Sequence, residues 1–262
     1  KTSMYPQSKK ILAAILFICV SGNTWSDTDN KTSHLIGPYL GQQVPGLQAE
    51  MFAPGIISTS GWEYGVVFTP DMKAMYFVRE VNTDSKPKQQ MVVYQQQSGI
   101  WQERVVSDRV GTPTFAPDNN TMFFGRGYKS RTKTGWSTMK RLGKDFEPFA
   151  IMRVTSSIDG TLAFDEVGEQ GNGILRYSSL NNGQRSAPKP FPTQINTGIW
   201  NAHPFIAPDE SYLIWDGQRN QTSANSDLFI SFKQPDGTWG AAIKFADNIN
   251  TADSEFAAQV TP

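Results

Sequence analysis

A short phrase recurs through this chain at near-regular intervals, and it limits the folds that the chain can adopt. Each copy ends in Asp, usually as Pro-Asp, and leads into a short apolar segment. The four Asp residues are Asp71, Asp118, Asp159 and Asp209, so successive copies lie 47, 41 and 50 residues apart. A period of roughly 40–50 residues built from short strands is typical of a β-propeller.

The phrase also predicts where the strands of each repeat lie. Pro fixes φ at about −65° and Asp can bond its own backbone, so Pro-Asp favours a tight turn between antiparallel strands. Second strands are expected at residues 75–77, 122–124, 162–164 and 213–215. Third strands are expected at residues 91–94, 174–177 and 227–230, with a weaker one at 137–139. Turns at Gly99, Gly135 and Gly237, each followed closely by Trp, are expected to begin fourth strands.

These patterns predict an all-β fold, a β-propeller of four-stranded antiparallel blades. Five repeats are visible, the last breaking off at residues 260–262, so we expect a C-terminally truncated gene product whose full form has five or six blades. Many propellers close one blade with strands from both chain ends, and residues 45–60 are candidates for the closing outer strand. An all-β sandwich is the alternative, but a sandwich has no reason to repeat Pro-Asp at this period.

The repeats resemble a known family. The blocks at 66–77, 113–124, 154–164 and 204–215 are similar to the WD40-like Pro-Asp propeller repeats of the TolB type. The likeness runs from about residue 50 to the end of the chain. It implies a periplasmic or exported propeller, and it carries over no catalytic residue because the shared positions are turn and core residues. TolB itself is six-bladed in family terms, whereas this chain shows five repeats.

The first residues resemble a secretory signal peptide. Lys9 and Lys10 precede the apolar run 11–20, and small residues follow at Thr24 and Ser26. The run is shorter than the roughly 20 residues of a transmembrane helix, so we expect cleavage after Ser26 and a periplasmic or secreted protein without a transmembrane segment. The predicted organisation is an extension with signal peptide at 1–26, a leader at 27–50 and the propeller at 51–262. The one cysteine, Cys19, lies in the signal segment, so the mature chain has no disulfide or thiol catalyst.

Counting back from each turn Asp gives the candidate site. The first strands of propeller blades line the central channel, and alternate residues face it. Positions three and five before Asp are mostly apolar and predict packing between blades, whereas positions four, six and eight are mixed. The channel candidates for ligand binding are therefore Glu63, Arg153, Asn201, His203 and Glu255. The same side chains could instead only solvate the channel.

Three further sequence features affect the interpretation of the site: a pair of tryptophans, a single histidine and short matches to a known turn motif. Trp62 and Trp200 both stand nine residues before the turn Asp and are rim candidates that could stack on a sugar or grip a protein strand, or pack under loops. His203 lacks two companion ligands at suitable spacing, so no metal site and no cofactor are predicted. Short matches to the Asp-box turns of sialidases lack the expected arginine cluster, with Arg153 alone predicted near the axis.

The sequence favours a binding or scaffold module of the cell envelope, with no catalytic residue assigned. The expected partner is an envelope or secreted protein, a peptide or a glycan; the balance of 24 Lys and Arg against 24 Asp and Glu argues against nucleic acid. The alternative is a carbohydrate-active enzyme, glycoside hydrolase-like, using Glu63 and Glu255 with Arg153 in the channel. A third hypothesis is a structural repeat domain with an apolar docking face.

Overall fold

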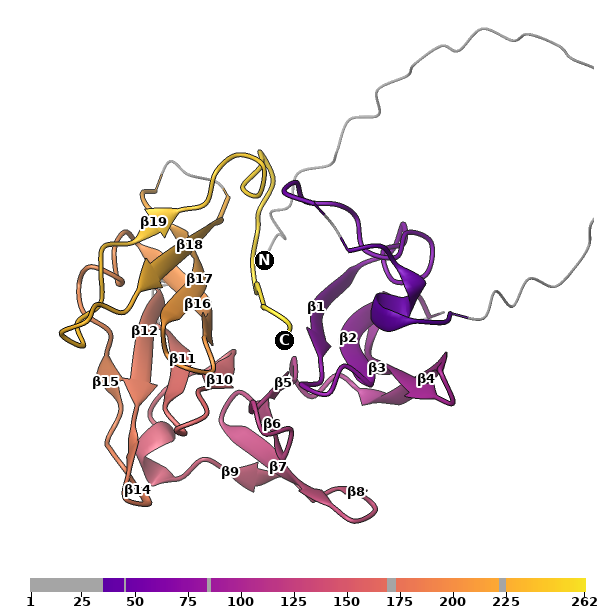
Figure 1. The fold of residues 1–262 in the computed structure, drawn as a ribbon, viewed down its shortest axis with the longest axis horizontal. Helices are drawn as coiled ribbons and strands as arrows, with labels where there is room; N and C mark the ends of the chain where they lie inside the picture. The colour runs from indigo at the N-terminus through magenta and orange to yellow at the C-terminus, as the bar shows by residue number, and fades with distance from the viewer. Residues whose placement is uncertain (1–34, 45, 84–85, 169–172, 222–224) are drawn as a thin grey trace, which may run out of the picture. The chain divides into compact units, whose positions relative to one another are not determined.

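The computed structural model describes residues 35–44, 46–83, 86–168, 173–221 and 225–262, and the predicted signal peptide at 1–26 lies outside them. From Leu35 onward these residues belong to one compact unit. Four antiparallel sheets follow one another along the chain and surround a common axis in propeller fashion (Figure 1). The predicted all-β propeller of four-stranded blades is thereby confirmed.

The first and fourth blades have the regular strand order. The first consists of β1 (Glu63–Phe68), β2 (Ala74–Val81), β3 (Lys88–Gln97) and β4 (Ile100–Asp108), and the fourth of β16 (Trp200–Ile206), β17 (Tyr212–Gln218), β18 (Asp227–Phe232) and β19 (Ile243–Lys244). In both, the innermost strand carries an irregularity in its pairing with the next strand, between Tyr64 and Val67 and between Ala202 and Phe205. Each irregularity adds one residue to the innermost strand, as a β-bulge does.

The second and third blades carry additional hairpins. The third consists of β10 (Val154–Ser156), β11 (Leu162–Val167), β12 (Gly173–Ser178) and β15 (Lys189–Pro190), with a hairpin of β13 (Leu180–Asn181) and β14 (Gln184–Arg185). The second consists of β5 (Thr114–Phe115), β6 (Thr121–Phe124) and β7 (Gly127–Thr132), and both β8 (Gly135–Trp136) and β9 (Lys140–Arg141) pair with β7. Two short 3-10 turns lie at Pro38–Gly41 and Lys144–Phe146.

The recurring turn has the same geometry in all four blades. The residue after the Asp has a left-handed backbone, with φ between 56° and 83°, and its N–H donates to the carbonyl three residues earlier over 2.8–3.2 Å. These residues are Met72, Asn119, Gly160 and Glu210. In three blades the Asp carboxylate also accepts the N–H two residues further on. In these blades the Asp carboxylate therefore stabilises the turn by a hydrogen bond to its backbone.

Apolar side chains pack between successive blades. Val67, Tyr76 and Val93 of the first blade contact Phe115 and Met122 of the second. Phe146 and Phe164 pack together between the second and third blades, and Trp215 and Phe229 belong to the cluster between the third and fourth. Two threonines at the same repeat position join the innermost strands directly. The Oγ1 of Thr114 donates to the Val154 carbonyl, and that of Thr155 donates to the Pro204 carbonyl over 3.1 Å.

The two ends of the described chain meet beside the first blade. Leu35 accepts the N–H of Trp101, whose indole N–H donates to Gly37 over 2.7 Å, so the leader packs on β4. Residues 255–262 run between β1 and β16 at the place of a fifth innermost strand (Figure 1), and Thr261 Oγ1 lies 3.0 Å from the Tyr39 hydroxyl. Within the described residues, this segment is not part of a sheet.

Four local predictions are corrected by the structure. The third strand of the second blade is β7, not residues 137–139, and the turn at Gly135 begins the hairpin strand β8 instead of the fourth strand. The turn at Gly237 leads into an isolated bridge between Trp239 and Lys233 instead of the fourth strand, β19. The described residues between 46 and 60 form no strand, so they do not supply a closing strand. Among the described residues, no helix has the length and apolar character needed to cross a membrane.

Candidate functional site

A cavity of about 620 Å³ opens where the innermost strands begin. The position six residues before the turn Asp lines it in all four repeats that contain this Asp, and the matching position of the fifth repeat lines it too: Gly65, Thr112, Arg153, His203 and Ala257. Three of these five residues have a left-handed backbone, with φ of 67° at Gly65, 47° at His203 and 57° at Ala257. The repeat therefore directs one residue from each copy into the same cavity.

The cavity is strongly basic. Three further arginines, Arg109, Arg126 and Arg141, line it together with Arg153 and His203, and no Asp or Glu is among its described lining residues. We call it the arginine cavity. The prediction that Arg153 stands alone near the axis is wrong, because these three arginines come from loops and from β9, outside the innermost strands. Aromatic rings form part of the wall, with Trp62 and Tyr64 in contact at a centroid distance of 5.0 Å.

Arg153 is the most deeply buried charged group of the cavity. Its residue surface is 3% exposed, and its Nε has no hydrogen-bond partner among the described residues. Burial lowers the pKa of Arg153 to about 10, against the opposing charges of Asp216 and Asp165. The guanidinium therefore remains charged at neutral pH and holds one donor that nothing satisfies, which is costly for a buried group.

Two buried carboxylates that the sequence analysis did not select support this arginine and His203. Asp165 accepts the N–H of Met152 (2.8 Å) and of Arg153 (3.0 Å) on one oxygen, and the N–H of His203 (2.9 Å) on the other. Burial raises the pKa of Asp165, although the charge of His203 and the three N–H groups oppose that effect. Asp216 lies at the equivalent position of the fourth blade and accepts the N–H of Ala257 over 3.0 Å. Each carboxylate thus fixes the cavity residue of the following repeat.

The structure separates the five channel candidates. Arg153 and His203 line the cavity, whereas Glu63, Asn201 and Glu255 do not. Asn201 is buried; its Oδ1 accepts the indole N–H of Trp215 over 3.0 Å, and its Nδ2 donates to the Thr197 carbonyl over 3.1 Å. Asn201 therefore holds a turn and a neighbouring strand together.

Glu63 and Glu255 occupy matching turns. The Oε1 of each accepts the hydroxyl of the Thr four residues earlier, Thr59 or Thr251, over 2.5 Å. Each carboxylate also accepts the backbone N–H of that Thr, over 3.2 and 3.0 Å. Oε2 of Glu255 is buried and has no partner among the described residues. These bonds account for both glutamates as turn residues.

The rim candidates differ in the same way. Trp62 is 51% exposed and lines the arginine cavity, whereas Trp200 does not line it and is paired with Gln218 in the fourth blade. Whether any predicted site residue contacts a ligand stays a prediction. Among the described residues, no group of three His, Cys, Asp or Glu side chains is arranged to hold a metal ion.

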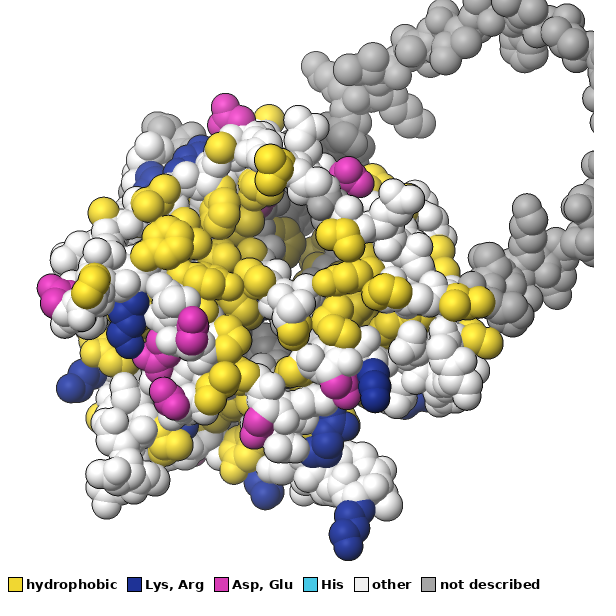
Figure 2. Space-filling view, viewed as in Figure 1, with side chains coloured by type: hydrophobic (Ala, Val, Ile, Leu, Met, Phe, Trp, Pro, Cys, Tyr) yellow, Lys and Arg dark blue, Asp and Glu magenta, His cyan; other side chains and the backbone are white. Residues whose placement is uncertain are grey.

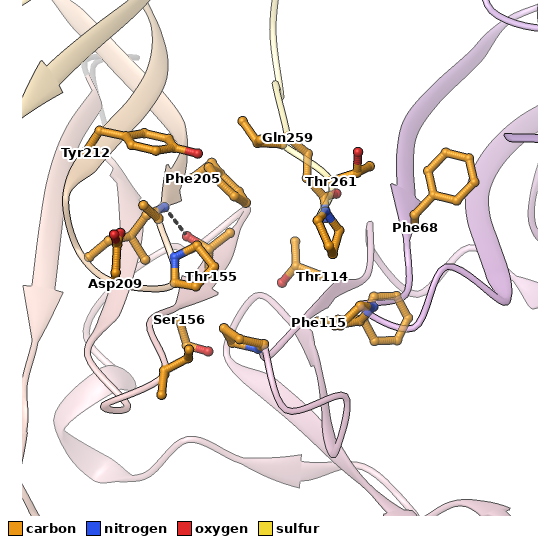
Figure 3. Close-up of a pocket in the computed structure, with 18 of the residues that line it drawn as sticks. Phe68, Thr114, Phe115, Thr155, Ser156, Phe205, Asp209, Tyr212, Gln259 and Thr261 are labelled. Carbon is orange, nitrogen blue, oxygen red and sulfur yellow. Dashed lines mark hydrogen bonds between the residues drawn. The ribbon is translucent and has the colours of Figure 1, made fainter. Parts of the chain in front are cut away.

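A second cavity of about 630 Å³ lies at the other end of the innermost strands (Figure 3). Its wall includes Phe68, Phe115, Phe205 and Tyr212, and the C-terminal residues Gln259 and Thr261 reach into it. The face in Figure 2 shows the same hollow surrounded by hydrophobic side chains. Asp209 is its one charged residue among those described, so this cavity lacks the positive charge of the arginine cavity.

Comparison with solved structures finds propellers. The chain is similar to TolB from Acinetobacter baumannii, with 17% identity and a TM-score of 0.48 over 71% of this chain and 44% of the TolB chain. It is also similar to two proteins that are provisionally named 6-phosphogluconolactonases. The one from Bacteroides uniformis has 14% identity, a TM-score of 0.38, and coverage of 68% and 69% of the two chains. The one from Bacteroides fragilis has 12% identity, a TM-score of 0.38, and coverage of 75% and 56%.

A TolB propeller is thus among the structures that this chain resembles, as its Pro-Asp repeats predict. The likeness concerns the fold alone, and the chain spans less than half the length of the TolB chain. No protein-family model and no curated protein matches the sequence.

Proposed function

We propose that this propeller is an exported binding module of the cell envelope that holds an anionic group of a protein or peptide partner in the arginine cavity. One observation carries the proposal. Arg153 is 3% exposed, lines the cavity and keeps an unpaired Nε donor among the described residues. An anionic group of a ligand in the cavity would lie against this buried guanidinium at the cavity wall.

The other arginines support an anion over a neutral ligand. Arg109, Arg126 and Arg141 are exposed and converge on the same cavity. Guanidinium groups form bidentate hydrogen bonds with carboxylates, and these bonds are stronger and more directional than those between neutral groups. Asp165 and Asp216 lie behind the cavity wall, where they balance the buried charge of Arg153 in the absence of a ligand. They leave the cavity itself free of competing carboxylates.

The alternative, a carbohydrate-active enzyme, has less support. It requires Glu63 and Glu255 to face a common substrate, and glycosidases hold their two carboxyl groups about 5–9.5 Å apart across the scissile bond. Both glutamates are instead bound within their own turns, and neither lines the arginine cavity. A binding role needs neither of them.

Titration calorimetry with a small tricarboxylate peptide, acetyl-Glu-Glu, tests the proposal. The wild type should bind this probe and should not bind acetyl-Gln-Gln-amide, which has the same shape without charge. The variant R126Q/R141Q removes two exposed cavity charges and should weaken binding at least tenfold. The variant K86Q/K189Q removes two exposed charges elsewhere and should bind as the wild type does. Equal binding by both double variants, or no binding by the wild type, would refute the proposal.

A further inference from the structure

The second blade carries a concentrated positive charge, and only part of it lines the arginine cavity. Between Asp118 and Asp145 the chain has seven basic residues and no acidic one. We call these seven the basic ridge: Arg126, Lys129, Arg131, Lys133, Lys140, Arg141 and Lys144. The whole chain has 24 basic and 24 acidic residues, so the remaining residues include seven more acidic than basic side chains. The positive charge is therefore localised on this blade.

The ridge is open to solvent, and its hydrogen bonds go to uncharged acceptors: Arg126 donates to the Glu147 carbonyl, and Arg131 donates to the carbonyl and side-chain oxygens of Asn119. Six of its side chains belong to exposed residues and Lys129 to a half-buried one. None of the seven forms an ion pair with any described residue. Lys and Arg side chains appear at the margin of the face in Figure 2 near the β7–β8 hairpin. A surface of this kind attracts an extended anion and holds few charges that would repel it.

Strand register arranges part of the ridge in a row that starts at the cavity. Arg141 pairs with Gly127, and both line the arginine cavity. Lys129 and Arg131 follow on the same face of β7, because alternate residues of a strand share a face. Successive side chains in this row are spaced by about 6.6–6.8 Å along the strand.

Cation–aromatic contacts hold these side chains in place. Lys129 lies 5.8 Å from the ring centroid of Phe124, Arg131 lies 4.2 Å from that of Trp136, and Lys140 lies 6.0 Å from that of Tyr128. Such contacts between a cation and a ring face are attractive at exposed sites. They reduce the entropy that the cations lose on binding, and they occupy ring faces on which a nucleotide base would otherwise stack.

We infer that the partner presents an acidic segment in extended conformation, which lies along the basic ridge with one carboxylate in the arginine cavity. This inference rests on the proposed function and names the partner class. Alternate side chains of an extended peptide are spaced by the same distance as the alternate cations of β7, so acidic residues at every second position match the row. Single-stranded nucleic acid is disfavoured because it gains much of its affinity from base stacking on free aromatic faces.

Fluorescence polarisation with labelled peptides at low ionic strength tests the inference. The main probe has four Asp residues alternating with Ser, and a second probe of the same composition has the four Asp residues consecutive. The ridge variant K129Q/K133Q lies outside the cavity, and K86Q/K189Q is its control with the same change in charge. Acetyl-Glu-Glu measures the cavity alone, and a hexathymidylate oligonucleotide represents nucleic acid.

We expect the ridge variant to bind the alternating peptide five- to tenfold more weakly and acetyl-Glu-Glu as the wild type does. The consecutive peptide should bind at least threefold more weakly than the alternating one. If the ridge variant binds the alternating peptide normally while R126Q/R141Q does not, the anion stays in the cavity; the inference then fails and the proposed function stands. Tighter binding of the oligonucleotide, with the same dependence on Lys129 and Lys133, would overturn the peptide assignment. If the wild type does not bind acetyl-Glu-Glu at all, the proposed function itself is wrong.

Discussion

His203 and Asp216 form the link between the cavity wall and the second strand of the fourth blade, with Nδ1 of the imidazole 2.9 Å from Oδ1 of the carboxylate. Asp216 is 2% exposed, and its Oδ1 also accepts the N–H of Ala257 from the C-terminal segment. The same carboxylate oxygen therefore joins a titratable side chain to the fifth repeat. A change in the charge of His203 should therefore affect both Asp216 and the contact of Asp216 with Ala257.

This link predicts a pH-dependent contribution to stability. Burial lowers the pKa of His203, but the hydrogen bond and charge of Asp216, with the charge of Asp165, outweigh burial and raise it above 6.5. A group whose folded pKa is raised binds its proton more tightly in the folded state. Its stabilisation is full below pH 6.5 and is lost as the pH rises through the folded pKa. We expect the unfolding free energy of the wild type to fall, relative to that of H203N, across that window.

Urea unfolding of both proteins between pH 5.5 and 9 measures this difference. Asn is the chosen replacement because it tolerates the left-handed backbone of position 203, where φ is 47°. Groups that do not interact with His203 titrate in the same way in both proteins, and the comparison removes their contribution. Parallel stability curves for the two proteins would show that the His203 proton is not linked to folding.

Asp165 should be the most sensitive carboxylate of the fold. It is fully buried, accepts three backbone N–H groups and lies near the charge of Arg153. The variant D165N loses the negative charge and places an amide donor against N–H donors, so unfolding free energy should fall by about 3 kcal/mol. The exposed variant D145N should change it by less than about 0.5 kcal/mol. Similar urea midpoints for the two variants would contradict the role assigned to Asp165.

Half of the site can be predicted from the sequence, because that half follows the repeat. Counting back from a fixed turn preserves the strand periodicity, so the sequence alone assigns Arg153 and His203 to the channel side. Arg109, Arg126 and Arg141 could not, because they come from loops and a short outer strand with no fixed distance to a turn Asp. Asp165 and Asp216 did leave a signal. Both directly follow the apolar second-strand segment, where the first two repeats have Val78 and Gly125.

The second blade shows why one strand was misplaced. Its third strand, β7, reads Gly-Tyr-Lys-Ser-Arg-Thr and has no apolar alternation, because its cations cover aromatic rings instead of facing solvent alone. The apolar pattern that identified β3, β12 and β18 was therefore absent from it. Residues 137–139, which the sequence predicts as the third strand, lie outside any strand.

The two glutamates of the enzyme hypothesis should behave as turn residues. E63A removes the acceptor for both the Thr59 hydroxyl and the Thr59 N–H, so unfolding free energy should fall by about 1 kcal/mol. Affinity for acetyl-Glu-Glu should stay within twofold of wild type. T59V should cost a similar amount, and the double variant should cost less than the two single changes together, since they remove the same contact.

A hydrolase assay on glycan substrates tests whether the two glutamates are catalytic residues instead of turn residues. If E63Q abolished a hydrolytic activity that the wild type possesses while leaving stability intact, Glu63 would be a catalytic residue and the turn assignment would be insufficient. The matching variant E255Q tests independently whether Glu255 is needed for hydrolysis.

Gly65 controls the space between the first and second blades at the cavity wall. Its φ is 67°, and a Cβ there would lie 2.2 Å from Cγ2 of Thr112, the residue at the equivalent position of the second blade. G65A should therefore combine backbone strain of about 1 kcal/mol with a steric clash that pushes Thr112 away, and the unfolding free energy should fall by more than 2 kcal/mol in total.

Gly99 is the matched control: its φ is 82°, and a Cβ there would meet no atom within 4 Å. G99A should show the strain alone. Adding T112A to G65A should recover the difference between the two variants in urea unfolding, because it removes the clashing methyl group. Failure of T112A to recover any stability would mean that backbone strain, and not the contact between the two blades, accounts for the loss.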